Sequence, residues 1–355
     1  MEDSDDLPQH YDDGNRAFLQ AFMARGTMTF KEAQPILAAI FSAQNPGEPA
    51  TAAGEVTRED FESYVAAASA ALSPFDMEIR STTHQARRER VWALVNTTSD
   101  ALTRLATLHS AEEIAFVRRV IDAMFERYNS PRLELMCLDA MQANKLRAPA
   151  ARGSDDDGGG GEEEGGAGEP SQPQTQALRA LKPSEVEAVL RSMVEAGWFE
   201  RSRAGFYSLS ARALAELRGW LPAAYNDADA GAGEWQRVKA CEACREIVTQ
   251  GQRCAERDCL ARLHDACAEA FFRGRDARQC PRCAREWSGR HFVGERAVTE
   301  SEAYRRGRRR SGRGGAGAAA AAPQEEEGEG EGEGEEGGGG RARDDEDGDG
   351  DEDGY

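Results

Sequence analysis

Seven of the eight cysteines in this 355-residue chain, and one of its five histidines, fall within a single short stretch. They form four closely spaced pairs: Cys241 and Cys244, Cys254 and Cys259, His264 and Cys267, Cys280 and Cys283. Two ligands on a short loop can reach one metal ion through Zn–S bonds of about 2.3 Å, so four pairs supply two tetrahedral zinc sites. Because no coordination position is left for water, we expect two structural zinc ions and not a hydrolytic centre.

A disulfide framework is the alternative interpretation of these cysteines, and it requires an oxidising compartment. The first residues, Met1 to Asp6, are acidic, and no apolar signal-peptide core follows them. A histidine in register with the cysteines also has no role in a disulfide scheme. The pattern therefore favours zinc.

Most of the net charge of −20 lies in two Gly/Glu/Asp-rich stretches, 154–169 and 323–355. Such sequences cannot bury enough apolar surface to offset chain entropy, so we expect a disordered linker at 151–176 and a disordered tail at 300–355. The tail begins with six arginines between 305 and 313, which could form a nuclear-import signal, a phosphate-binding arm or a solvated linker. No apolar run approaches the roughly 20 residues of a membrane-spanning helix, so no membrane association is expected.

The region 14–150 is predicted to be a mainly helical domain with one small hairpin. Apolar residues recur at helical spacing, and capping boxes at Thr29–Glu32 and Ser110–Glu113 mark two helix starts. Two β-like runs, 77–79 and 91–95, are separated by a polar stretch and predict the hairpin.

Local features of the same region give three more expectations. Ser130-Pro131 is predicted to begin a helix, because proline is well tolerated at the first helical position. His84 and His109 stand alone in polar segments and are expected at the surface, without a metal or catalytic role. Cys137 lies in an apolar stretch and is expected to be a small buried side chain.

The region 177–225 is predicted to be a second domain. A capping box at Ser184–Glu187 precedes an apolar helical stretch, and two short strands at 198–199 and 206–209 flank a glycine-containing turn. Ser210 then caps a further helix. Helix, tight hairpin and helix are typical of winged-helix domains, and the region 14–150, with helices followed by a hairpin, has a related pattern. We therefore predict a mainly α chain with small β-hairpins and tandem winged-helix domains.

Winged helices either bind DNA or dock proteins. A DNA-binding interpretation would use a recognition helix together with basic wing residues such as Arg201 and Arg203. The helix at 185–195, however, carries three glutamates and one arginine, whereas base recognition favours positive charge and polar donors. Protein docking is therefore favoured, with DNA contact as the alternative.

The order of four Cys, one His and three Cys is shared by three kinds of zinc module: PHD histone readers, RING-CH membrane ligases and a RING variant of a chromosome-maintenance complex. Arg278 stands where PHD fingers usually carry tryptophan, and the membrane helices that RING-CH ligases need are not predicted. The last pair, in the form Cys-Pro-Arg-Cys at 280–283, is common in RING domains. We predict a cross-brace RING-like domain at 238–290, in which the first and third pairs bind one zinc ion and the second and fourth pairs bind the other.

Over about 14–287 the chain resembles the non-structural maintenance of chromosomes element 1 family, the RING subunits of SMC five–six complexes. The resemblance rests on the zinc ligands and on the order of several segments: FLQAFMARG (18–26), DMEIR (76–80), WALVNTTSD (92–100), EIAFVRRV (113–120) and the GWF…GFYSLSARALAEL hairpin unit.

This resemblance implies a nuclear, chromosome-associated protein that acts in DNA repair and homologous recombination. Its winged helices would bind a MAGE-type subunit, a kleisin-type subunit would complete the assembly, and its RING would position a ubiquitin-conjugating enzyme, with possible DNA contact through the complex. The protein would then be a RING-type E3 ubiquitin transferase. A non-enzymatic, zinc-stabilised scaffold of the same complex is the alternative.

The resemblance also implies a docking surface for the ubiquitin-conjugating enzyme, formed by Ala243, Phe271, Phe272 and Pro281. Ala243 offers a small apolar contact. Ala284 stands where active RINGs often carry a basic residue that contacts ubiquitin, a role that Arg282 or Arg285 would have to take. We therefore expect activity to depend on the partner subunit.

Overall fold

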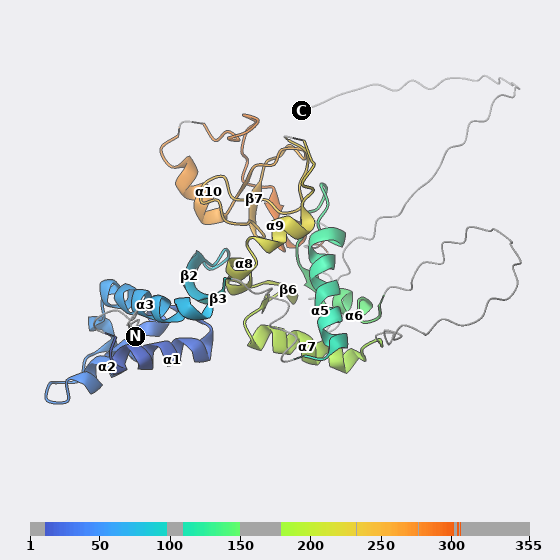
Figure 1. Ribbon diagram of the computed structural model, residues 1–355. Coiled ribbons are helices and arrows are strands. Elements are labelled where there is room, and N and C mark those ends of the chain that lie inside the picture. Colours follow the sequence, from blue (N-terminus) through green and yellow to red (C-terminus); the bar gives the residue numbers. More distant parts are fainter. Residues whose placement is uncertain are drawn as a thin grey trace, which may run out of the picture. The chain divides into compact units, whose positions relative to one another are not determined.

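A computed structural model describes residues 11–97, 109–149, 179–231, 233–275, 277–301, 304 and 306. The expected linker at 151–176, most of the expected tail at 300–355 and five of the six arginines between 305 and 313 lie outside the described residues. The helices and small sheets follow one another in three regions, 11–97, 109–225 and 226–301, called the first, second and third regions below (Figure 1). Within these described residues, no helix is both long and apolar enough to cross a membrane.

The first region packs three helices with a three-stranded antiparallel sheet of order β1-β3-β2. In chain order its elements are α1 (Asp13–Arg25), β1 (Thr27–Thr29), α2 (Phe30–Gln44), η1 (Ala53–Glu55), α3 (Arg58–Leu72), η2 (Ser73–Phe75), β2 (Met77–Thr83) and β3 (Arg90–Asn96). The predicted hairpin is confirmed by pairing of β2 with β3 along their whole length. The predicted capping box at Thr29–Glu32 begins α2.

Aromatic packing holds this first region together. Phe18, Phe22 and Phe61 are fully buried, and the Phe61 ring meets the Trp92 ring edge-on at a centroid distance of 4.7 Å. Trp92 lies on the central strand β3, so this contact joins the helices to the sheet. Edge-to-face pairs of this kind contribute about 0.5–1.5 kcal/mol beyond the area that they bury.

The second region repeats the element order of the first: helix, strand, helix, helix, strand, strand. Its elements are α5 (Ala111–Asp122), the π-helical turn η3 (Ala123–Arg127), β4 (Leu138–Asp139), α6 (Ala140–Lys145), α7 (Pro183–Glu195), β5 (Phe199–Arg201), β6 (Phe206–Leu209), α8 (Ala211–Glu216) and α9 (Trp220–Tyr225). The sheet order β4-β6-β5 matches that of the first region. The predicted hairpin at 198–209 and the caps at Ser110 and Ser210 are confirmed.

Residues 109–149 pack with residues 179–225, whereas the sequence predicted a domain boundary at 150 between them. Phe116 and Val120 of α5 share one apolar cluster with Val189 and Leu190 of α7, and β4 pairs with β6. Figure 1 shows α6 beside α5, with α7 crossing near the lower end of α5. These elements therefore complete the sheet and core formed by residues 179–225.

The helix predicted from Ser130-Pro131 is wrong, because α6 begins only after Asp139, whose carboxylate caps the helix by accepting from the Gln142 N–H at 2.7 Å. The apolar run before it is not helical: Met136 is in the left-handed region at φ 46°, and the run ends in strand β4. Its buried residues alternate between two clusters, with Leu135 and Cys137 in one and Met136 and Leu138 in the other. An apolar run of this length does not distinguish strand from helix by periodicity. The expected burial of Cys137 is confirmed.

Two other expectations need correction. The cap predicted at Ser184–Glu187 is wrong, because α7 begins at Pro183 and the Glu185 carboxylate accepts from the Lys182 N–H at 2.8 Å. His84 is not a surface residue: it is 6% exposed, and its Nε2 lies 2.8 Å from the Glu200 carboxylate of β5. The side chain of His109 is also largely buried and contacts Glu113.

The third region contains only short elements. They are β7 (Gly251–Arg253), β8 (Arg262–Leu263), α10 (Asp265–Phe272), β9 (Phe292–Val293) and α11 (Arg296–Thr299), with sheet order β8-β7-β9. Its apolar residues continue the core of the second region.

A buried charge cluster joins the second region to the third. Glu134, in the segment before β4, is 2% exposed and accepts hydrogen bonds from Arg262 of β8, which is 1% exposed. Lys239 Nζ lies 3.2 Å from the same carboxylate, and Trp235 Nε1 donates to it at 3.3 Å. Burial raises the pKa of Glu134, but the hydrogen bonds and charge of Arg262, the charge of Lys239 and the Trp235 hydrogen bond together outweigh burial, so the pKa is lowered.

We expect Glu134→Ala to lower the free energy of unfolding by about 3–5 kcal/mol at pH 7, because it leaves two buried cations without their anion. Chemical denaturation of the full chain measures this loss. The pKa of Glu134 is lower in the folded than in the unfolded chain, so its contribution is present above its unfolded pKa. The contribution is lost as the pH falls through the folded pKa, and the difference between wild type and variant should shrink at acidic pH.

Glu256→Ala is the matched control, because it removes the half-exposed partner of the exposed Arg285, at 2.9 Å, in the same third region. Exposed pairs contribute about 0–1 kcal/mol. Equal losses in the two variants would contradict the role assigned to the buried cluster.

Candidate metal centre

The four ligand pairs of the third region come together as two clusters. Cys241, Cys244, His264 and Cys267 form the first cluster, and Cys254, Cys259, Cys280 and Cys283 form the second. In each cluster the four ligand atoms lie within 4.8 Å of one another. The pairs that were predicted to share a metal ion, first with third and second with fourth, are the pairs that the fold brings together.

Two equivalent turns present the Cys-x-x-Cys pairs. In the first, the Cys241 N–H donates to the Glu246 carbonyl at 2.8 Å, and the Arg245 N–H donates to the Cys241 carbonyl at 2.9 Å. The turn of Cys280 and Cys283 repeats both contacts, at 2.7 Å and 3.0 Å, with the residues at the same offsets. The residue after the second cysteine is left-handed in both turns, Arg245 with φ 66° and Ala284 with φ 57°.

The remaining ligands are placed by the sheet and by α10. Cys254 directly follows β7, and Cys259 precedes β8. His264 is the N-cap residue of α10, and Cys267 lies three residues further along, within its first turn. Residues three apart lie on the same side of a helix, so α10 directs both toward the first cluster.

The histidine of the first cluster is held in one orientation. Its Nδ1 lies 3.3 Å from Cys244 Sγ and 3.8 Å from Cys267 Sγ, and its Nε2 lies 3.2 Å from the Ile247 carbonyl oxygen. Because a carbonyl only accepts, Nε2 carries the proton and donates it, which leaves the Nδ1 lone pair directed at the cysteines. Metal-binding histidines typically use their second nitrogen in this way.

The cysteines of the two clusters are not joined by disulfides. All eight cysteines are free, and the shortest sulfur–sulfur contacts recorded in the second cluster are 3.5 Å, far longer than an S–S bond. A hydrogen bond from Cys244 is the main cause that lowers the pKa of Cys241 to about 3, whereas burial raises the pKa of Cys254 and of Cys259. The backbone N–H of Arg285 is the main cause that lowers the pKa of Cys283 to about 7.

The donor sets fit zinc. One cluster offers three sulfurs and one imidazole nitrogen, the other four sulfurs, and neither includes a carboxylate. Sulfur and imidazole donors in closed sets of four are typical of structural Zn²⁺, whereas Ca²⁺ and Mg²⁺ take oxygen ligands.

The proposed docking residues do not all lie at the surface. Ala243 and Pro281 are exposed, each beside a cysteine of a different cluster, and Phe271 is half-buried beneath the Arg275 guanidinium at 3.9 Å. Phe272 is 5% exposed and packs against Trp287 at a centroid distance of 5.8 Å, so it belongs to the interior.

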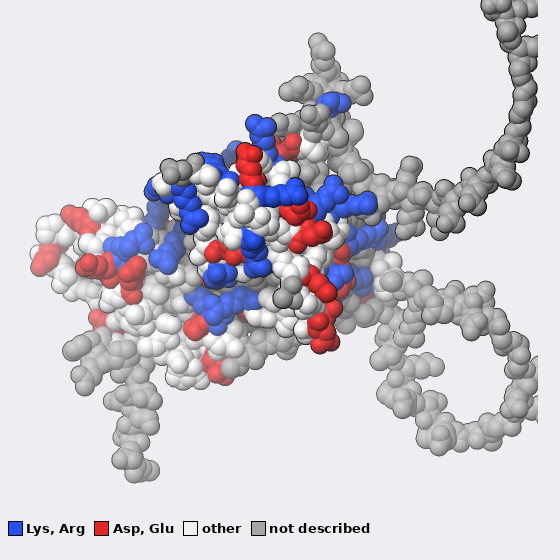
Figure 2. Space-filling view, turned by 90° about the horizontal axis from the view of Figure 1, so that it is seen from above, with Lys and Arg blue, Asp and Glu red and all other residues white. Residues whose placement is uncertain are grey.

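Arginines around the clusters pair with acidic groups of the same region. Arg282 contacts Glu242, and Arg285 contacts Glu256 at 2.9 Å. Arg262, which lies near the second cluster in sequence, donates to the Cys259 carbonyl at 2.7 Å as well as to Glu134. Figure 2 shows basic and acidic side chains interspersed on the face that it presents. This surface is therefore mixed in charge.

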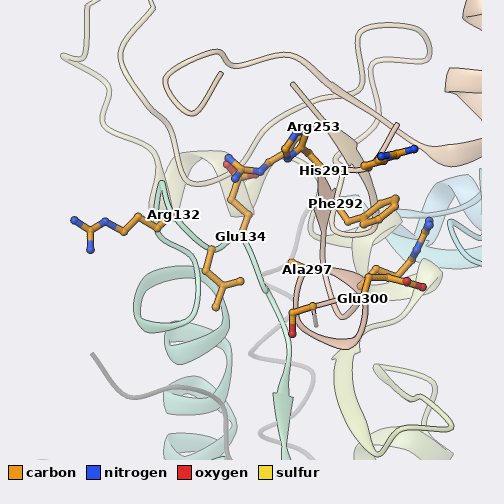
Figure 3. Close-up of a pocket in the computed structure, with 11 residues that line it drawn as sticks. Arg132, Glu134, Arg253, His291, Phe292, Ala297 and Glu300 are labelled. Atoms are coloured by element: carbon orange, nitrogen blue, oxygen red, sulfur yellow. The ribbon is translucent and has the colours of Figure 1, made fainter. Parts of the chain in front are cut away.

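A small cavity of about 180 Å³ lies between the Arg132–Glu134 segment, the end of β7 and the segment of β9 and α11 (Figure 3). Four arginines line it, but Arg132 points away from Arg253 in Figure 3, and Arg296 is paired with Asp265 at 2.6 Å. Burial, followed by the charge of Arg253, lowers the pKa of His291. The side chains that line the cavity do not point toward one common ligand position, and no sequence motif indicated the cavity.

Comparison with known proteins places these features in a family. The family model described as “Nse1 non-SMC component of SMC5-6 complex” matches residues 15–217, more than half of the chain, and a model described as “RING-like domain” matches residues 241–283. The chain also resembles a solved chain of an “Nse1-Nse3-Nse4 complex”, with a TM-score of 0.56 and 19% identity over 79% of this chain and 99% of that chain. At this identity the likeness shows a shared fold.

Several curated relatives carry the name “Non-structural maintenance of chromosomes element 1 homolog”. The human protein is 20% identical over 78% of this chain and 84% of its own length. The Xenopus laevis protein is 24% identical over 61% of this chain and 64% of its own length, so the match spans just under two thirds of that relative. A protein of Saccharomyces cerevisiae named “Non-structural maintenance of chromosomes element 1” is 25% identical over 48% of this chain and 47% of its own.

We expect the full chain, purified with zinc present, to hold about two zinc ions per molecule by elemental analysis, because the two clusters offer eight ligands. Cys283→Ser should hold about one, since a hydroxyl replaces one thiolate of the second cluster. Cys137→Ala, which removes the eighth cysteine, should still hold about two. A folded wild-type chain without metal, or one whose cysteines are oxidised to disulfides, would show that the clusters are not zinc sites.

Proposed function

Because the chain belongs to the family of Nse1 non-SMC components of the SMC5-6 complex, we propose that it is the RING-type ubiquitin ligase subunit of such a complex. One observation carries the proposal: two interleaved Cys/His clusters follow directly on a region that matches the family. The chain would act in the nucleus, at chromosomes, in DNA repair and homologous recombination.

The proposed chemistry is positioning, not covalent catalysis. A RING holds a ubiquitin-conjugating enzyme and orders its thioester-linked ubiquitin for attack by a substrate lysine, an effect of proximity and orientation. Ala243, Phe271 and Pro281 are the surface or half-buried residues that we assign to the docking of that enzyme. No residue of this chain has to form an intermediate.

Two zinc ions would supply the stability of the third region and no reactive group. The eight residues of the two clusters would hold them, with three thiolates and one imidazole at the first site and four thiolates at the second. Metal binding would be coupled to folding, because the ligands come from distant segments and the strands between them are short.

We propose that the first and second regions are winged-helix domains. The repeated order of helix, strand, two helices and a hairpin, with the same sheet order in both regions, supports this assignment. The second domain would run from about residue 109 to 225 instead of beginning at 177, because α5, β4 and α6 complete its core and sheet. The RING-like domain would occupy 238–290.

These domains would dock a MAGE-type subunit and a kleisin-type subunit. The solved structure with a shared fold is named as a complex of Nse1 with Nse3 and Nse4, which supports partners of this kind. Glu187 and Glu195 of α7 are exposed, and Arg201 of the β5–β6 hairpin lies over the Tyr207 ring at 5.6 Å. The acidic surface of α7, together with a hairpin arginine that already packs on a tyrosine ring, favours protein docking over DNA recognition.

A non-enzymatic scaffold is the second candidate. Ala243 offers little apolar area, and Arg282 and Arg285, the candidates for a contact with ubiquitin, are paired with Glu242 and Glu256. Both observations favour a role in assembly, or activity only with the partner subunits bound.

We expect Ala243→Arg to reduce ubiquitin transfer by about tenfold or more, the effect of losing about 1.4 kcal/mol of binding. The added side chain would block the docking surface without disturbing the core, because Ala243 is exposed. Transfer is measured in a reconstituted reaction with the zinc-loaded full chain, a ubiquitin-conjugating enzyme and ubiquitin, with and without the MAGE-type and kleisin-type subunits.

Ala255→Arg is the matched control, since Ala255 is an exposed alanine beside Cys254, a ligand of the other cluster. It should leave transfer and zinc content unchanged. If both variants match an active wild type, the docking assignment is wrong. If wild type transfers no ubiquitin under any condition yet assembles with its partners, the scaffold is the function.

A further inference from the structure

The turn of the β2–β3 hairpin, at residues 84–89, contacts the segment that follows the first Cys-x-x-Cys pair. Gln85 Nε2 donates to the Ile247 carbonyl at 2.8 Å. Gln85 Oε1 accepts from the Thr249 and Gln250 N–H groups at 3.0 Å and 2.8 Å. One side chain of the first region thereby binds three backbone groups of the third.

The Ile247 carbonyl is also the group that orients the histidine of the first cluster. It accepts from His264 Nε2 at 3.2 Å while it accepts from Gln85. A carbonyl oxygen has two lone pairs and can accept both donors. Gln85 is therefore joined to the first cluster through two hydrogen bonds that meet at one oxygen atom.

The Ile247 carbonyl lies in a segment that Gln85 contacts with both the nitrogen and the oxygen of its side-chain amide. Ile247 and Thr249 are 8% and 3% exposed, so their backbone groups are shielded from water. Without Gln85 the Thr249 and Gln250 N–H groups would lose the acceptor recorded for them, and a buried group without its partner is costly. The segment would be expected to shift, and the acceptor that holds His264 would shift with it.

The second cluster has no comparable link. Among the hydrogen bonds recorded for the described residues, none joins residues 84–89 to Cys254, Cys259, Cys280 or Cys283. The turn also contacts Glu200 of β5 through His84, at 2.8 Å, and the exposed Glu269 of α10 through Arg88, at 2.7 Å.

We propose that Gln85 is a positioning residue for the first metal site, so that zinc affinity at this site, and not at the second, depends on the docked β2–β3 hairpin. The proposal rests on the zinc-binding role given to both clusters above. Partners that orient a metal ligand typically change metal affinity by about 10- to 100-fold when they are removed.

The test compares zinc release from full-length wild type, Gln85→Ala and Gln85→Glu to a chromophoric chelator. Wild type should release two zinc ions slowly. Both variants should release one of the two about 10- to 100-fold more readily, because alanine removes all the contacts and glutamate can no longer donate to the Ile247 carbonyl. Gln85→Glu keeps the acceptor for Thr249 and Gln250, so it separates the loss of the Ile247 contact from general loosening.

Cobalt substitution identifies the site that is lost. Co²⁺ bound by three thiolates and one imidazole absorbs differently from Co²⁺ bound by four thiolates, so the visible spectrum assigns the weakened ion. The three-thiolate spectrum should fade first in both Gln85 variants. Arg88→Ala removes a solvent-exposed ion pair between the same turn and α10 but leaves the Gln85 contacts in place, so it should match wild type.

Because coupling between two sites is reciprocal, removal of zinc from the first site should also speed amide hydrogen exchange at residues 84–89 in wild type. Two zinc ions released equally slowly from wild type and both Gln85 variants would overturn the inference while leaving the metal sites intact. Equal weakening of both sites would overturn it too. A wild type that binds no zinc would overturn the metal centre itself, together with this inference.

Discussion

The third region depends on the crossing of its four ligand pairs. β8 and β9 have two residues each and β7 has three, so the sheet alone is too small to be stable. The first cluster joins the turn at Cys241 to α10, and the second joins the end of β7 to the turn at Cys280. Because the segment of Cys254 and Cys259 lies between the two halves of the first cluster, neither cluster can open without disturbing the other. Ala243 and Pro281 lie between the two cysteines of these Cys-x-x-Cys turns, and both residues are exposed.

Contacts between the regions combine a shared apolar core with a few buried polar groups. Glu134 with Arg262, His84 with Glu200, and Gln85 with the segment at 247–250 each connect different regions. Buried pairs of this kind add little net stability relative to apolar packing, but leaving one partner alone is costly. Their effect is therefore to specify one arrangement. Arg262 illustrates this, since both oxygens of Glu134 and two backbone carbonyls accept its hydrogen bonds.

Sequence reasoning succeeded where a local pattern determines the structure. The spacing of the eight ligands predicted both clusters and their pairing, and the capping boxes at Thr29 and Ser110 predicted two helix starts. It failed where tertiary contacts decide. Nothing near Pro131 reveals that Leu135 and Met136 face different clusters, and nothing near residue 150 reveals that β4 pairs with β6. His84, Gln85 and Glu134 are polar residues in polar or mixed segments, and only the fold shows that each contacts another region.

The charge and area of the third region's surface bear on how it could engage a conjugating enzyme. Acidic and basic groups neutralise one another there, with Glu242 contacting both Arg245 and Arg282, so long-range steering by a field of one sign is weak. Ala243 contributes a single methyl group, and burying one such group is worth only about 0.8 kcal/mol. The cost of bringing two proteins together is several times larger. For the function proposed above, engagement must therefore draw on further contacts, which the proposed partner subunits would supply.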